Sequence, residues 1–184
     1  VEDAAGEQAW ASILIKADGK IVYRSGEDRN ANSLGWRIEL PLKPRTRYDY
    51  ALTVSSTKGD TAAAEGFFET GKREEAWFAH WISPRNSQRS ALLRKRFPAE
   101  TAEGPARLYC CGLGIYEAYL NGIKVGQEFL APGYHSYDFH LATQTYDVTG
   151  FLKENNTIEL RLADGWFRGS VAAYGVTNVF GMQT

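Results

Sequence analysis

Apolar and polar residues alternate with a period of two along most of this chain, and no stretch keeps a helical period over several turns. Turn sequences such as Asp18-Gly19 and Lys58-Gly59-Asp60 separate the alternating stretches of the first part. These stretches are Trp10–Ala17, Lys20–Arg24, Leu34–Leu40, Tyr48–Ser55 and Glu65–Thr70. Each is the length of a short strand, and short strands at this spacing favour a β-sandwich.

The second part of the chain has the same character. Asn121-Gly122 lies between two alternating arms and predicts a tight hairpin, because both central positions of such a turn need a positive φ. We expect a further turn at 151–156. The predicted strands are Ala91–Phe97, Ala106–Cys111, Tyr116–Leu120, Ile123–Val125, Thr143–Val148 and Thr157–Leu162. Many short antiparallel strands with glycine-rich turns indicate a jelly roll, so the predicted fold class is all-β.

A polar stretch at residues 71–90, interrupted by Trp77, Phe78 and Trp81, separates the two parts. It predicts one domain over 1–72, a linker over 73–90 and a second domain over 91–184.

Charge and composition exclude several partners. The chain has 21 Lys and Arg against 22 Asp and Glu, with no cationic excess in either part, which argues against a nucleic-acid partner. The apolar runs are too short for a membrane span. The first residue is Val1 and not Met, so the missing signal peptide does not indicate the cytoplasm. Cys110 and Cys111 are adjacent and do not suit an ordinary disulfide.

One segment of the first part carries a specific resemblance. The sequence Leu42-Lys43-Pro44-Arg45-Thr46-Arg47-Tyr48 resembles the corner of fibronectin type III domains, which belong to the immunoglobulin-like sandwiches. The resemblance implies that the Tyr48 hydroxyl bonds back to the backbone. Five strands are visible where such a domain has seven, so we expect this sandwich to be incomplete at its N-terminus.

Four ordered blocks of the second part also resemble a known family. They are Tyr109–Gly126, Leu130–Asp138, Gln144–Leu152 and Ala163–Gly169. Together they are similar to the amino-terminal β-domain of bacterial α-L-rhamnosidases, glycoside hydrolase family 78. The family continues with further strands and a helical catalytic barrel, so the resemblance implies that this jelly roll is incomplete at its C-terminus. It also implies a downstream catalytic domain as partner, L-rhamnose-containing carbohydrate as ligand, and a secreted or periplasmic location.

Catalysis is not expected in this chain. Glycoside hydrolysis needs a pair of carboxylates, and the candidates are Glu117, Asp138, Asp147, Glu159 and Asp164. Carboxylates more often serve caps, turns and solvated faces, and Asp147 is placed to cap the turn that follows it. We therefore predict no catalytic residue. His135 and His140 are interpreted as surface or packing residues.

Two functions remain open. Trp166 lies between glycines and beside Arg168, which suits a sugar that stacks on a flat ring while polar groups bind its hydroxyls. We predict a carbohydrate site with Trp166 stacking, Tyr137 beside it, and Asp138 and Arg168 binding hydroxyls. The resemblance makes calcium the one candidate cofactor, at Asp164. The alternative is a structural spacer without ligand, in which Trp166 plugs the end of the sandwich.

Overall fold

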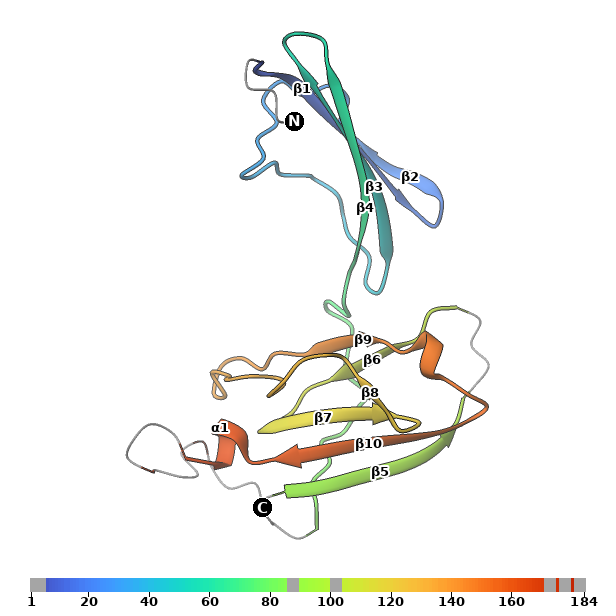
Figure 1. Ribbon diagram of the computed structural model, residues 1–184, viewed down its shortest axis with the longest axis vertical. Helices are drawn as coiled ribbons and strands as arrows, with labels where there is room; N and C mark the ends of the chain where they lie inside the picture. The colour runs from blue at the N-terminus through green and yellow to red at the C-terminus, as the bar shows by residue number, and fades with distance from the viewer. Residues whose placement is uncertain (1–5, 86–89, 100–103, 171–174, 176–179, 181–184) are drawn as a thin grey trace. The chain divides into compact units, whose positions relative to one another are not determined.

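The computed structural model describes residues 6–85, 90–99, 104–170, 175 and 180. The chain divides into two compact units, Val1–Ala79 and His80–Thr184. Each unit is built from antiparallel sheets (Figure 1), so the all-β prediction is confirmed.

The first unit contains one four-stranded antiparallel sheet in the order β2-β1-β3-β4. Its strands are β1 (Gln8–Ala17), β2 (Lys20–Arg24), β3 (Arg47–Ser56) and β4 (Thr61–Glu69). The predicted turn at Asp18-Gly19 joins β1 and β2, and both of its residues have positive φ, 50° and 71°. Strand β4 begins four residues earlier than predicted, because the small residues from Ala62 onward pair with the end of β3.

The prediction of a strand at Leu34–Leu40 is wrong. Among the described residues, this segment pairs with no strand, and Leu34 is 94% exposed. The segment packs on the sheet through Ile38 and Leu40, while the intervening positions are exposed. The alternation of apolar and polar residues therefore correctly predicted an extended segment with one buried side. A β-strand also requires a neighbouring strand that pairs with its backbone N–H and C=O groups, and this segment has none among the described residues.

Tyr48 anchors the core of the first unit. Its side chain is 2% exposed and stacks on Phe68 with ring centroids 5.0 Å apart. The backbone N–H of Lys43 donates a hydrogen bond of 2.8 Å to the Tyr48 hydroxyl oxygen. The predicted return contact of the tyrosine corner is confirmed, and it ties the segment before β3 to the sheet.

The second unit contains a four-stranded sheet in the order β5-β10-β7-β8 and a two-stranded sheet, β6-β9. The strands are β5 (Ser90–Pro98), β6 (Arg107–Cys110), β7 (Ile115–Leu120), β8 (Ile123–Val125), β9 (Gln144–Asp147) and β10 (Asn155–Ala163). A 3₁₀ turn, η1 (Thr149–Phe151), precedes β10, and a short helix, α1 (Gly165–Arg168), follows it. The two sheets form two layers (Figure 1).

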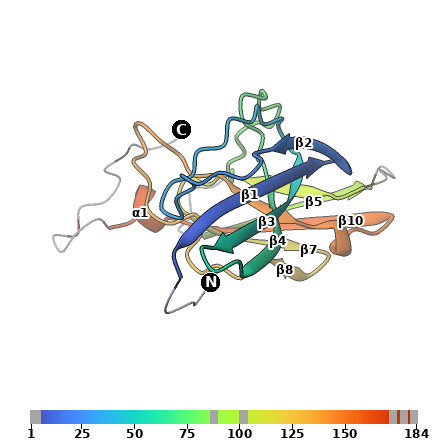
Figure 2. The ribbon, with the colours of Figure 1, turned by 90° about the horizontal axis from the view of Figure 1, so that it is seen from above.

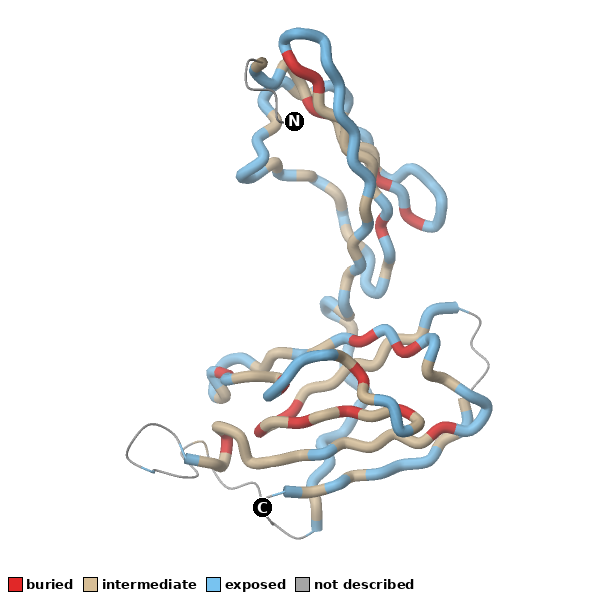
Figure 3. The backbone as a smooth tube through the Cα atoms, viewed as in Figure 1, coloured by how far each residue is buried: buried red, intermediate tan, exposed pale blue. Residues whose placement is uncertain are grey.

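The core of this unit lies between the two layers. Strand β7 alternates strictly between buried and half-buried positions (Figure 3), with Tyr116, Ala118 and Leu120 facing inward. Tyr146 of β9 and Leu160 of β10 pack against them. It follows that Glu117 and Tyr119 of β7 lie on the opposite, outer face of the sheet.

A pair of asparagines fixes the end of this sheet. Asn121 and Gly122 have φ values of 54° and 83°, as the hairpin prediction requires. The Asn121 amide nitrogen donates to Asn156 Oδ1 at 2.9 Å, and Asn121 Oδ1 accepts from Thr157 N–H at 2.9 Å. The predicted turn over 151–156 is too long by two residues, since Asn155 and Asn156 already belong to β10.

No helix among the described residues is long and apolar enough to span a membrane.

Candidate functional site

The chain turns sharply where β10 ends and α1 begins (Figures 1 and 2), and a glycine makes this turn possible. Gly165 has a φ of 52°, and a side-chain Cβ there would lie 2.8 Å from the backbone nitrogen of Ile115. Gly165 therefore allows close approach of the protein's own backbone at the start of β7.

The segment around Tyr137 meets α1 at this end of the unit. The Tyr137 ring lies edge to face against Phe167 with centroids 5.1 Å apart, and 5.9 Å from Tyr134. Phe180 is 4.7 Å from it, centroid to centroid. The two segments predicted to form one site thus converge, and the contact between them runs through Phe167 and not through Trp166.

The remaining predicted site residues lie around this contact. Trp166 is half-buried, whereas Phe167 is buried. Asp164 and Arg168 are half-buried, and Arg168 Nε is 3.7 Å from Asp164 Oδ1. Asp138 is exposed. Neither Trp166 nor Tyr137 is fully buried, so burial does not by itself favour the spacer.

The two most buried members of this aromatic cluster were not among the predicted sugar-binding residues, although His135 was interpreted as a surface or packing residue. Phe167 is 6% exposed and His135 is 3% exposed. The His135 ring lies 5.5 Å from that of Tyr137. Burial lowers the pKa of His135 below its ordinary value, against the opposing effect of a hydrogen bond with the Pro132 backbone. The density of aromatic residues at 134–139 was the available signal.

Three buried polar atoms of this cluster make no hydrogen bond of standard geometry with the described residues. They are the hydroxyl oxygen of Tyr137 and both ring nitrogens of His135. Burial also raises the pKa of Tyr137, which keeps its proton and remains able to donate. Such buried polar atoms are few in folded proteins and call for a specific explanation.

The carboxylates outside this cluster have structural partners. Asp147 Oδ1 accepts from the Thr149 backbone at 3.0 Å and from its hydroxyl at 2.7 Å, so the predicted cap is confirmed. These bonds lower the pKa of Asp147. Glu117 is bound by Lys124, and Glu159 by Arg94.

No group of three or more His, Cys, Asp or Glu side chains within the described part of the chain is arranged to hold a metal ion. Calcium usually takes six to eight oxygen ligands. Asp164 as a calcium ligand therefore stays a prediction.

Comparison with known proteins identifies the second unit. Residues 103–183 match the family model of the α-L-rhamnosidase N-terminal domain. An α-L-rhamnosidase from Streptomyces avermitilis is 45% identical over 166 residues, which cover 82% of this chain. The second unit belongs to the α-L-rhamnosidase N-terminal domain family.

Other α-L-rhamnosidases are similar to this chain over most of its length, which includes both units. An α-L-rhamnosidase from an Alteromonas species is 32% identical over 179 residues, or 89% of this chain. The crystal structure of the native α-L-rhamnosidase from Aspergillus terreus covers 96% of the chain with a TM-score of 0.79 and 26% identity, while this chain covers 22% of it. The chain spans only 16% and 18% of the lengths of the two bacterial relatives.

Proposed function

We propose that the second unit is a non-catalytic accessory module of an α-L-rhamnosidase and binds L-rhamnose at the end of the unit where α1 meets Tyr137. The relatives are named for the release of this sugar, and the rest of such a protein would supply the catalytic domain as partner.

The observation that carries the proposal is the convergence of two segments distant in sequence. Tyr137 packs on Phe167 of α1, and the preceding residue, Trp166, remains half-buried beside the charged pair Asp164 and Arg168. An aromatic ring with a guanidinium and a carboxylate nearby matches a pyranose, which has an apolar face and a rim of hydroxyls.

The buried polar atoms support the same location. The Tyr137 hydroxyl and the His135 ring lie near backbone groups of His135 and Pro132, but they make no hydrogen bond of standard geometry with the described residues. Because these atoms are buried, a polyhydroxylated ligand would use their hydrogen-bonding capacity only if the cluster opens on binding.

Isothermal titration with L-rhamnose tests the proposal. The wild-type chain is expected to bind with a Kd of about 10⁻⁴ to 10⁻³ M, because a monosaccharide has few heavy atoms. Trp166→Ala should abolish the saturable heat. Trp81→Ala is the matched control, because Trp81 is 62% exposed and lies outside the site. Repeating the titration with calcium and with chelator tests Asp164.

Flat titrations of the folded wild-type chain would contradict rhamnose binding and leave the structural spacer. Equal losses in Trp166→Ala and Trp81→Ala would place the site elsewhere.

A further inference from the structure

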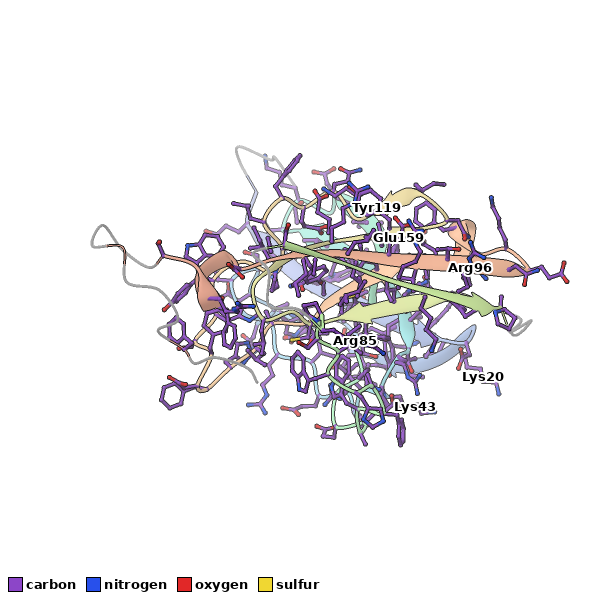
Figure 4. The ribbon with its side chains drawn as sticks, turned by 90° about the horizontal axis from the view of Figure 1, so that it is seen from below. Lys20, Lys43, Arg85, Arg96, Tyr119 and Glu159 are labelled. Atoms are coloured by element: carbon purple, nitrogen blue, oxygen red, sulfur yellow. The ribbon has the colours of Figure 1, made fainter. Side chains whose placement is uncertain are left out.

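The outer face of the four-stranded sheet in the second unit carries an ordered array of charged side chains. Figure 4 shows Tyr119 and Glu159 close together on this sheet and Arg96 farther along it. Glu159 pairs in register with Arg94 on one side and with Tyr119 on the other. Two positions along β10, Arg161 stands between Leu92 and Glu117.

Hydrogen bonds and ion pairs hold this array in place. Arg94 binds Glu159 at 2.6 Å, and Lys124 binds Glu117 at 2.9 Å. The Tyr119 hydroxyl donates to Glu117 Oε2 at 2.8 Å. Because the side chains are held on regular strands, a ligand would meet a face that is already organised.

The positive charge of Arg161 is only partly compensated, because it helps to lower the pKa of the nearby Glu117 carboxyl, which already pairs with Lys124. Arg161 donates to the Tyr119 hydroxyl at 3.3 Å and lies 4.2 Å above the Tyr119 ring, but it forms no ion pair with a described carboxylate. The two carboxylates of the array are already paired with Arg94 and Lys124. A guanidinium has five donors, so most of those on Arg161 remain available for a ligand.

A hollow of about 460 Å³ lies beside Arg161. Its lining includes Arg161 and Glu117 together with the exposed apolar side chains Leu92, Phe129 and Leu130. This volume falls within the range of small-molecule sites. The lining offers apolar surface, the Arg161 guanidinium with donors still available, and the Glu117 carboxylate, which can still accept from hydroxyl groups.

We propose that this hollow binds a uronic acid unit of an acidic saccharide. The carboxylate of the sugar pairs with Arg161, because a planar guanidinium can donate two parallel hydrogen bonds to a carboxylate. The C–H face of the ring lies against Leu92 and Phe129, and Glu117 accepts from a hydroxyl. This site shares no residue with the one at Trp166 and does not depend on the proposed rhamnose binding.

An NMR titration of the whole chain with two matched probes tests the proposal. Methyl β-D-glucuronide carries a carboxylate where methyl β-D-glucoside carries a hydroxymethyl group, and the two are otherwise the same. We expect the glucuronide to shift the amides of Leu92, Glu117 and Arg161 with a Kd of about 10⁻³ M. The glucoside should bind at least about tenfold more weakly, since charge-assisted hydrogen bonds are about twice as strong as neutral ones.

Two variants locate the effect. Arg161→Gln should weaken glucuronide binding about tenfold, whereas Arg96→Gln, which removes the same charge from β5 outside the hollow, should leave it unchanged. Equal affinity for the two probes, an equal loss in both variants, or no shift at these amides would overturn the proposal. The probe comparison uses the wild-type chain, so it remains decisive if a variant fails to fold.

Discussion

Replacing Asn156 by alanine is expected to destabilise the second unit by about 3 kcal/mol. Asn156 is 2% exposed, and its amide makes three hydrogen bonds. Its Oδ1 accepts from Lys153 N–H at 2.8 Å and from the Asn121 amide at 2.9 Å. Its Nδ2 donates to the Lys153 carbonyl at 2.6 Å. A hydrogen bond of this kind contributes about 1 kcal/mol, and a partner left buried costs more.

Urea unfolding followed by the amide resonances of β7 and β10 measures this loss in the second unit alone. A loss of about 3 kcal/mol should lower the urea midpoint by about 1–2 M. Asn155→Ala is the matched control, because Asn155 is the preceding residue of the same strand and is exposed. It should change stability by less than about 0.5 kcal/mol. If both variants unfold at the same urea concentration, the amide pair does not fix this end of the sheet.

Three further predictions follow from single groups. Tyr48→Phe should destabilise the first unit by about 1–2 kcal/mol in thermal unfolding, because the Lys43 N–H loses its acceptor, and an unchanged midpoint would contradict the role of the corner. The pKa of His135 is lowered in the folded state, so the unfolded state binds more protons as the pH falls. The second unit should therefore lose stability below about pH 6.5, and the dependence of the unfolding free energy on pH should be weaker in His135→Phe. Burial raises the pKa of the Cys110 thiol to about 11, so a disulfide reagent at pH 8 should label it far more slowly in the native chain than in urea, and equal rates would disprove the burial.

The elements that depend on local chemistry were predictable from the sequence. Asn121-Gly122 determines its own turn through positive φ, and β8 begins and ends where the pattern placed it. The segment 34–40 shows the limit of this reasoning. Its alternation correctly reports one buried side, but whether it joins a sheet depends on a distant partner that periodicity does not reveal.

The sequence was sufficient to predict which segments form the candidate site, but not which side chains of those segments touch. The family blocks indicated that Tyr137 and the α1 sequence matter, and the structure brings them together. Which of two adjacent aromatics faces inward depends on the exact phase of a four-residue helix. Phe167 therefore takes the buried contact with Tyr137, and Trp166 remains half-buried.

The array on the outer sheet face could not be recognised from the sequence. Arg161, Glu117 and Leu92 are separated by many residues, and only the strand order β5-β10-β7 places them in one row. The charges of the whole chain nearly cancel. That the Arg161 guanidinium has no ion-pair partner becomes visible only when each neighbouring carboxylate has been assigned to its own partner.

The indole N–H resonances of the tryptophans test the central claim, rhamnose binding at Trp166, most directly. The chain has five tryptophans, and comparison with Trp166→Phe assigns the resonance of Trp166. On addition of L-rhamnose, the account predicts a saturable shift of the Trp166 indole while the other four remain in place. A Trp166 resonance that stays unmoved at saturating sugar, or a shift shared equally by all five, would contradict it.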